Sequence, residues 1–187
     1  DGFGVLFDPR LAPYGEGEWN PPFEHDQGII AVWDSKGYIR IQGLHVQNSR
    51  RSAISAHGVK DYMTEIKKGP ESEKTRPRFL EINFNTTDRC NEMGINIKWW
   101  NDVRAVGNRI VRPHSEQMVF SIPGDVRDGM DYPPQTPMSR RHHGQEGLDL
   151  SQNRRFVIAF NEVYGGGKEA IDCISVTDGE IYGNTVH

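Results

Sequence analysis

Short runs in which apolar and polar residues alternate recur along the chain, and each run carries a Gly or an Asn near its middle. Alternation with a period of about two residues is typical of a β-strand, whose side chains point alternately to two faces. No segment shows a sustained apolar period of about 3.6 residues, which an amphipathic helix would require. The pattern therefore predicts short strands within residues 39–46, 80–85, 103–110, 156–163 and 181–186.

These runs recur at a fixed interval. Asn85 and Asn108 are 23 residues apart, and so are Asn161 and Asn184. A repeat of about 20–50 residues is the mark of a solenoid, in which each coil stacks on the one before it. Further apolar residues, most of them 10 or 11 positions after such an anchor, predict one more strand in each coil, centred on Ile54, Ile95, Val119, Leu148 and Ile171.

Pairs of carboxylates repeat at the same interval. Glu146 and Glu169 are 23 residues apart, and so are Asp149 and Asp172. If consecutive repeats form adjacent rungs, these acids lie on strands separated by about 4.7–4.9 Å. Crowded carboxylates are costly unless they bind a cation, share protons or take part in chemistry. We therefore expect a functional site at the acid cluster, defined as these four residues.

Aligning the five central strands predicts which side chains share the outer surface. One outward column contains Ser55, Asn96, Phe120, Asp149 and Asp172. The next contains His57, Lys98, Ile122, Ser151 and Ile174. The residues at the turn that enters each strand are Ser52, Met93, Gln117, Glu146 and Glu169. Because the columns become acidic only in the last two coils, the pattern indicates a local site and not a generally solvated face.

Strand runs with an Asn ladder at this interval resemble the right-handed parallel β-helix of the pectin-lyase-like superfamily. The resemblance covers residues 28–187 and implies an all-β solenoid, with an irregular N-terminal segment at residues 1–27. The polar stretches 69–78 and 123–145 are predicted to be loop insertions. The ladder Asn side chains are expected to bond the backbone groups that a tight turn leaves unpaired. Both ends resemble the interior of a stack, so we expect a subunit or a further chain segment to cover the open ends.

Two short strings resemble motifs of polygalacturonase-type glycosidases. Residues 144–149 (GQEGLD) resemble their Asn-Thr-Asp-Gly-Ile-Asp motif, with Glu146 in the place of the catalytic Asp. Residues 170–174 (AIDCI) resemble their Gly-Asp-Asp-Cys-Ile motif, in which Asp172 matches one acid and Ile171 replaces the other. The resemblance implies cleavage of glycosidic bonds.

Glycoside hydrolysis requires two carboxyl groups, one protonated and one ionised. Glu146 and Glu169 are the preferred pair, because adjacent rungs would raise the pKa of one of them by mutual repulsion. Asp149 and Asp172 are then expected to tune this pair or to position water. The expected partner is an extracellular polysaccharide or oligosaccharide, and no cofactor is required.

The same acids permit two other interpretations. In a polysaccharide lyase acting on a uronic acid polymer, they would supply oxygen ligands to a Ca²⁺ ion, and a basic side chain would abstract a proton. Candidates for that base are Lys168, Lys98, Arg140 and Arg141, although Lys168 is better explained as a salt-bridge partner. The other alternative is a non-catalytic β-helix that binds glycans or is purely structural.

Several basic and aromatic residues are candidate substrate contacts. Arg140 and Arg141 could grip carboxylate or sulfate groups, or be solvated. The remaining candidates are His142 and His143, which precede the acids, and Lys98, Trp99 and Trp100. The indoles would either stack on sugar rings or pack in a core. His57 is expected to be a surface residue away from the acids.

Composition narrows the class of protein only a little. The 187 residues carry a net charge of −4, with 35% hydrophobic residues, 20 Gly and 11 Pro. This charge gives no signal for nucleic acid or an anionic membrane, and no apolar run approaches the roughly 20 residues of a membrane span. No signal peptide opens the chain, so we expect one to have been removed or to lie upstream of a secreted, periplasmic or cell-surface protein. The two cysteines are too few for a disulfide scaffold, and Cys173 is expected to be a buried free thiol.

Overall fold

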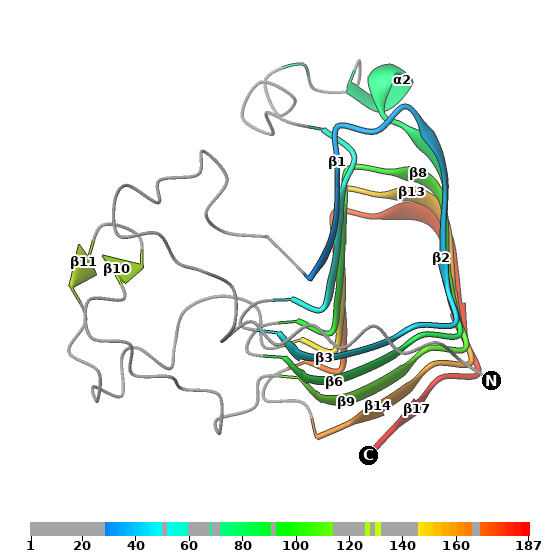
Figure 1. The fold of residues 1–187 in the computed structure, drawn as a ribbon. Helices are drawn as coiled ribbons and strands as arrows, with labels where there is room; N and C mark the ends of the chain where they lie inside the picture. The colour runs from blue at the N-terminus through cyan, green and yellow to red at the C-terminus, as the bar shows by residue number, and fades with distance from the viewer. Residues whose placement is uncertain are drawn as a thin grey trace.

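Most of the described chain forms three parallel sheets of five strands each (Figure 1). The structure is a computed structural model, and it describes residues 29–49, 52–59, 68, 72–90, 93–113, 126–127, 130–131, 146–165 and 169–187. The first sheet has the order β1 (Ile30–Trp33), β4 (Ile54–His57), β7 (Ile95–Lys98), β12 (Leu148–Ser151) and β15 (Ile171–Ile174). The second contains β2 (Gly37–Gln42), β5 (Arg78–Asn83), β8 (Asn101–Val106), β13 (Arg154–Ala159) and β16 (Thr177–Tyr182). The third contains β3 (His45–Ser49), β6 (Thr86–Cys90), β9 (Arg109–Pro113), β14 (Glu162–Tyr164) and β17 (Thr185–Val186).

Three consecutive strands make one coil, because each coil contributes one strand to each sheet. Every pairing between coils in these sheets is parallel. This arrangement confirms the predicted all-β class with parallel sheets and is compatible with a solenoid-like β-helix. Four of the five predicted runs span two strands, with a Gly or Asn at the turn between them, and the run 80–85 covers the end of β5 and the turn that follows it.

The register confirms the adjacency on which the acid cluster depends. Leu148 pairs with Ile171, and Asp149 pairs with Asp172. The prediction of a rung centred on Val119 between those of Ile95 and Leu148 is wrong, since Leu148 pairs directly with Ile95. Residues 114–125 lie outside the described part of the chain. The fifth rung of the first sheet is instead β1, where Ile30 pairs with Ile54.

The Asn ladder has the structural role expected from the sequence. Asn108 Nδ2 donates to the Ile82 carbonyl at 2.7 Å, and Asn108 Oδ1 accepts from the Asn85 backbone amide at 3.0 Å. The next contact runs directly from Asn108 Nδ2 to Asn161 Oδ1 at 2.9 Å, across 53 residues of sequence. The ladder therefore continues without a missing step, in agreement with the direct pairing of β7 with β12.

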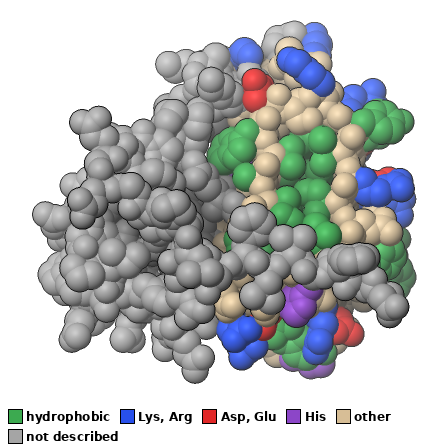
Figure 2. Space-filling model, in the orientation of Figure 1, with side chains coloured by type: hydrophobic (Ala, Val, Ile, Leu, Met, Phe, Trp, Pro, Cys, Tyr) green, Lys and Arg blue, Asp and Glu red, His purple; other side chains and the backbone are tan. Residues whose placement is uncertain are grey.

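Apolar side chains fill the space between the three sheets, as Figure 2 shows at the end of the stack that faces the viewer. The largest fully buried side chains include Trp100, Ile54, Leu80, Ile82, Ile95, Ile97, Ile110, Leu148, Leu150 and Ile158. The turn before the Asn ladder uses left-handed backbone conformations in every coil, at Gly43, Phe84, Gly107, Phe160 and Gly183. The Phe84 ring lies over Gly107, where an added Cβ would meet ring carbons at 2.6 Å. Glycine at that position therefore provides both the conformation and the space for the ring.

The two predicted insertions differ in how much of them is described. In residues 69–78, Ser72–Thr75 form the short helix α2 and Arg78 already begins β5, so this stretch is not simply a loop. In residues 123–145, only the antiparallel pair β10 (Val126–Arg127) and β11 (Met130–Asp131) is described. The predicted N-terminal segment 1–27 lies outside the described residues. No described helix is long and apolar enough to cross a membrane.

Candidate functional site

The acid cluster lies on the last two strands of the first sheet and at the turns that enter them. Asp149 and Asp172 occupy matching positions on β12 and β15, at the spacing of about 4.7–4.9 Å between paired strands. Glu146 and Glu169 lie two residues before the two strands, where the Gly147 amide donates to the Glu169 carbonyl at 3.0 Å. Glu146 and Asp149 are buried, and the other two acids are half-buried.

The surroundings of Asp149 raise the pKa of its carboxyl group. Burial raises its pKa to about 6, and the nearby negative charges of Glu146 and Asp172 act in the same direction. Lys98 and the Ser151 hydroxyl oppose the shift. Lys98 Nζ is 3.8 Å from Asp149 Oδ2, and Ser151 Oγ donates to Asp149 Oδ1 at 3.0 Å. Asp149 is therefore a carboxyl group that exchanges its proton close to neutral pH and is held in one orientation.

The direct pairing of β7 with β12 changes the predicted outward columns. Lys98 is the neighbour of Ser151, and Asn96 is the neighbour of Asp149, with neither Phe120 nor Ile122 between them. Lys98 was predicted to be a substrate contact or a base, and the structure brings it into contact with the acid cluster. This contact exists because no extra rung separates β7 from β12.

His57 was predicted to be a surface residue, and this prediction is wrong. Its side chain is only 6% exposed, and its ring centroid lies 4.3 Å from that of Trp33. His57 Nε2 is 3.5 Å from Asn96 Nδ2, and Asn96 is in register with Asp149. The outer side of the first sheet therefore carries a row of polar groups that leads from His57 to the acids.

The two indoles are not arranged as exposed sugar platforms. Trp100 is fully buried and belongs to the core between the sheets, and Trp99 is 6% exposed with the Arg76 guanidinium 4.9 Å from its ring. The sequence left the choice between core and platform open, and burial decides it in favour of packing. Both cysteines are free thiols: Cys90 is buried, whereas Cys173, expected to be buried, is only half-buried.

Five of the predicted site residues lie outside the described residues, namely Arg140, Arg141, His142, His143 and Lys168. Within the residues that the structure describes, no group of three or more His, Cys, Asp or Glu side chains is arranged to hold a metal ion. The Ca²⁺ ion of the lyase alternative stays a prediction.

Comparison of the chain with protein-family models, with curated proteins and with solved structures gave no match in any of the three. A function is therefore inferred from the geometry of the acid cluster.

Proposed function

We propose that this chain is a right-handed parallel β-helix of the pectin-lyase-like type that hydrolyses glycosidic bonds of an extracellular polysaccharide at the acid cluster. The observation that carries the proposal is the pairing of Asp149 with Asp172 on adjacent strands, with one carboxyl buried and the other half-buried. Glycosidases need two carboxyl groups in different environments, one to donate a proton and one to act as a base or nucleophile.

The geometry favours Asp149 as the general acid, in place of the Glu146 that motif resemblance suggested. Its burial keeps the proton on the carboxyl group up to a pH of about 6. Ser151, which donates to Oδ1 of the same carboxyl group, holds it in place. Glu146 and Glu169 flank this pair at the preceding turns and remain candidates for binding sugar hydroxyls.

In the proposed reaction, Asp149 transfers its proton to the glycosidic oxygen as the bond from that oxygen to the anomeric carbon breaks. Asp172 accepts a proton from a water molecule, whose oxygen forms the new bond to the anomeric carbon. Proton exchange with solvent then restores both carboxyl groups. Each positioned acid or base of this kind raises the reaction rate by about 10²- to 10⁴-fold.

Asp149→Asn and Asp172→Asn, each made singly, should lower turnover by at least about 100-fold on a susceptible polysaccharide. Glu162→Gln is the control, because Glu162 is an exposed carboxyl group on β14, in the third sheet, that pairs with Arg109. Reducing ends are measured on a panel of plant and microbial polysaccharides, and circular dichroism verifies the fold of each variant. Full activity in both Asp149→Asn and Asp172→Asn would reject the assignment, and absence of cleavage across the panel would favour a non-catalytic β-helix.

A lyase is the second candidate, because Lys98 is the one predicted base that the described structure places beside the acids. Products that absorb in the ultraviolet as unsaturated uronates would establish elimination, whereas reducing ends without that absorbance support hydrolysis.

A further inference from the structure

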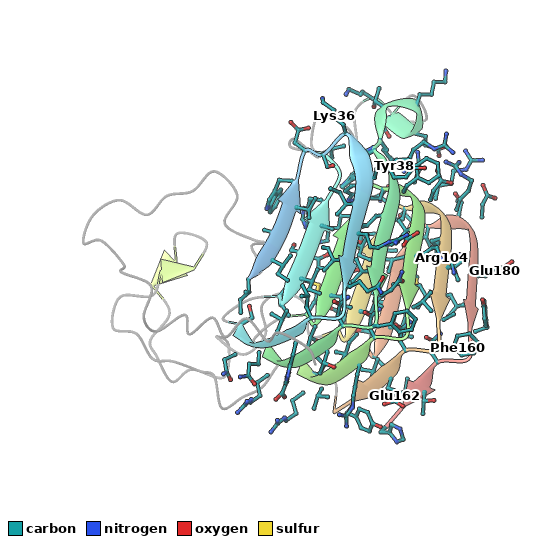
Figure 3. The ribbon with its side chains drawn as sticks, turned by 45° about the vertical axis from the view of Figure 1, so that its right-hand side comes forward. Lys36, Tyr38, Arg104, Phe160, Glu162 and Glu180 are labelled. Carbon is teal, nitrogen blue, oxygen red and sulfur yellow. The ribbon has the colours of Figure 1, made fainter. Side chains whose placement is uncertain are left out.

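A groove lies on the outer face of the second sheet, whereas the acid cluster lies on the first sheet. The groove has a volume of 330 Å³ and is lined by residues of β5, β8, β13 and β16. Figure 3 shows this face, with Tyr38 near one end of the strands, Phe160 near the other, and Arg104 and Glu180 between them. None of these residues has a part in the chemistry proposed above.

Most charged groups around the groove neutralise one another. The ion pairs are Arg40–Glu81 at 2.7 Å, Arg78–Asp102 at 2.5 Å, Arg155–Asp102 at 2.6 Å, Arg154–Asp178 at 2.7 Å, and Arg154–Glu73. Within the described part of the chain, Arg104 and Glu180 have no such partner. Glu73 lies on α2, so the five strands of this sheet themselves carry five arginines and four carboxylates, a net charge of only +1.

Arg104 and Glu180 occupy one outward column, separated by a single rung. Arg104 pairs in register with Val157, and Val157 pairs with Glu180. Two strand spacings separate the charged residues by about 9–10 Å. A guanidinium presents N–H donors and a carboxylate presents acceptors, and hydroxyl groups of a sugar satisfy both.

Aromatic side chains add apolar contact area at one end of the groove. Phe79 lines it and is 41% exposed, and Tyr38, with a ring centroid 4.9 Å away, is 84% exposed. Exposed aromatic faces supply the apolar surface on which the C–H face of a sugar ring packs. A net charge of only +1 gives little attraction to a polyanion such as nucleic acid, or to an anionic membrane.

We propose that this groove is a second, non-catalytic binding surface for a neutral polysaccharide chain, held by Arg104, Glu180 and the Tyr38–Phe79 pair. The choice of a glycan as the occupant rests on the proposed function. The surface would keep the enzyme on its polymer between cleavage events, since two linked contacts raise the effective affinity of the chain for the substrate.

The test measures retention of the full chain in native gels that contain a soluble neutral polysaccharide, with xyloglucan, galactomannan and mixed-linkage β-glucan as probes and polygalacturonate as the acidic comparison. Arg104→Ala, Glu180→Gln and Tyr38→Ala should each weaken retention by about 3- to 10-fold, the loss of one polar or stacking contact. Arg109→Ala and Glu162→Gln are matched controls, because these residues form an exposed ion pair on the third sheet. The controls should keep the original retention.

Retention that is unchanged in all three groove variants, or weakened equally by the Arg109 control, would overturn this inference. So would a failure of every neutral polysaccharide to retard the protein. The two proposals fail separately, because cleavage of a short oligosaccharide depends on Asp149 and not on the groove. Loss of retention with unchanged cleavage of that oligosaccharide is the expected result, and groove-dependent retention without any cleavage would reject the hydrolase alone.

Discussion

Asp149→Asn should make the protein more stable at pH 7 while it removes the proposed general acid. Burial raises the pKa of Asp149 to about 6, above the 3.8 of an ordinary Asp. The unfolded chain therefore releases this proton at a lower pH than the folded protein does. Ionisation then favours the unfolded state increasingly between about pH 4 and pH 6, and the effect is constant above that range.

The size of the effect follows from the two pKa values. The difference between 3.8 and about 6 corresponds to about 3 kcal/mol of unfolding free energy lost by pH 7. An amide cannot ionise, so the Asp149→Asn variant would avoid this loss. The favourable effect of Lys98, whose Nζ lies 3.8 Å away, is already contained in this raised pKa and is not deducted again. We therefore expect a net gain of about 3 kcal/mol at pH 7 and almost none at pH 4.

Urea unfolding of wild type and Asp149→Asn at intervals from pH 4 to pH 8 measures this difference directly. Asp102→Asn provides a control of opposite sign, because hydrogen bonds from Arg155 and Arg78 lower the pKa of Asp102. That variant should be less stable than wild type by a constant amount from pH 4 to pH 8, because the pKa of Asp102 lies below its ordinary value of 3.8 and the difference shrinks only below about pH 4. The difference in unfolding free energy between Asp149→Asn and wild type could instead be the same at pH 4 and at pH 7. In that case burial does not raise the pKa of Asp149, and its assignment as proton donor is wrong.

Four further outcomes follow from the same structure. The pH profile of kcat/KM should decline above about pH 6 as Asp149 ionises, and a profile that is flat from pH 5 to pH 8 would contradict this role. Asn108→Ala removes hydrogen bonds to a backbone amide and a backbone carbonyl of neighbouring coils, so chemical denaturation should reveal a loss of about 3 kcal/mol. Gly107→Ala places a Cβ 2.6 Å from the Phe84 ring at a φ of +65° and should cost at least about 1–2 kcal/mol, whereas an unchanged melting temperature would refute the close approach. Cys90, whose pKa burial raises to about 12, should react with a thiol reagent only as fast as the protein unfolds, and rapid labelling of the native protein would show that this thiol is accessible.

Much of the fold followed from local pattern. The 23-residue interval that separates Asn85 from Asn108 also separates Asp149 from Asp172, and both pairs lie on adjacent coils. This works where consecutive coils have the same length, because equivalent residues then fall in register on adjacent strands. The alternation of residues likewise identified inward positions such as Leu148 and Ile171 without any knowledge of the tertiary structure.

The sequence alone did not show which coils are adjacent across its longest interruption, the segment between β7 and β12. The tertiary structure shows it. The sequence distance between Ile95 and Leu148 is 53 residues, a length equally consistent with one more coil or with an insertion between directly paired strands. The position of Val119, 11 residues after Asn108, favoured the extra coil, but hydrogen bonding between β7 and β12 and between Asn108 and Asn161 excludes it. Lys98 reaches the acid cluster for this reason alone.

Burial was the second property that the sequence left open. The alternation predicts to which side of a strand His57 or Asp149 points, but not whether that side is accessible to water. Both are at most 6% exposed in the folded protein. The sequence by itself determined which residues are neighbours along a column, because strand period and coil length are local properties. Only the tertiary structure decided the environment of those residues, since desolvation depends on everything that packs around a group, and desolvation is what makes Asp149 a candidate acid.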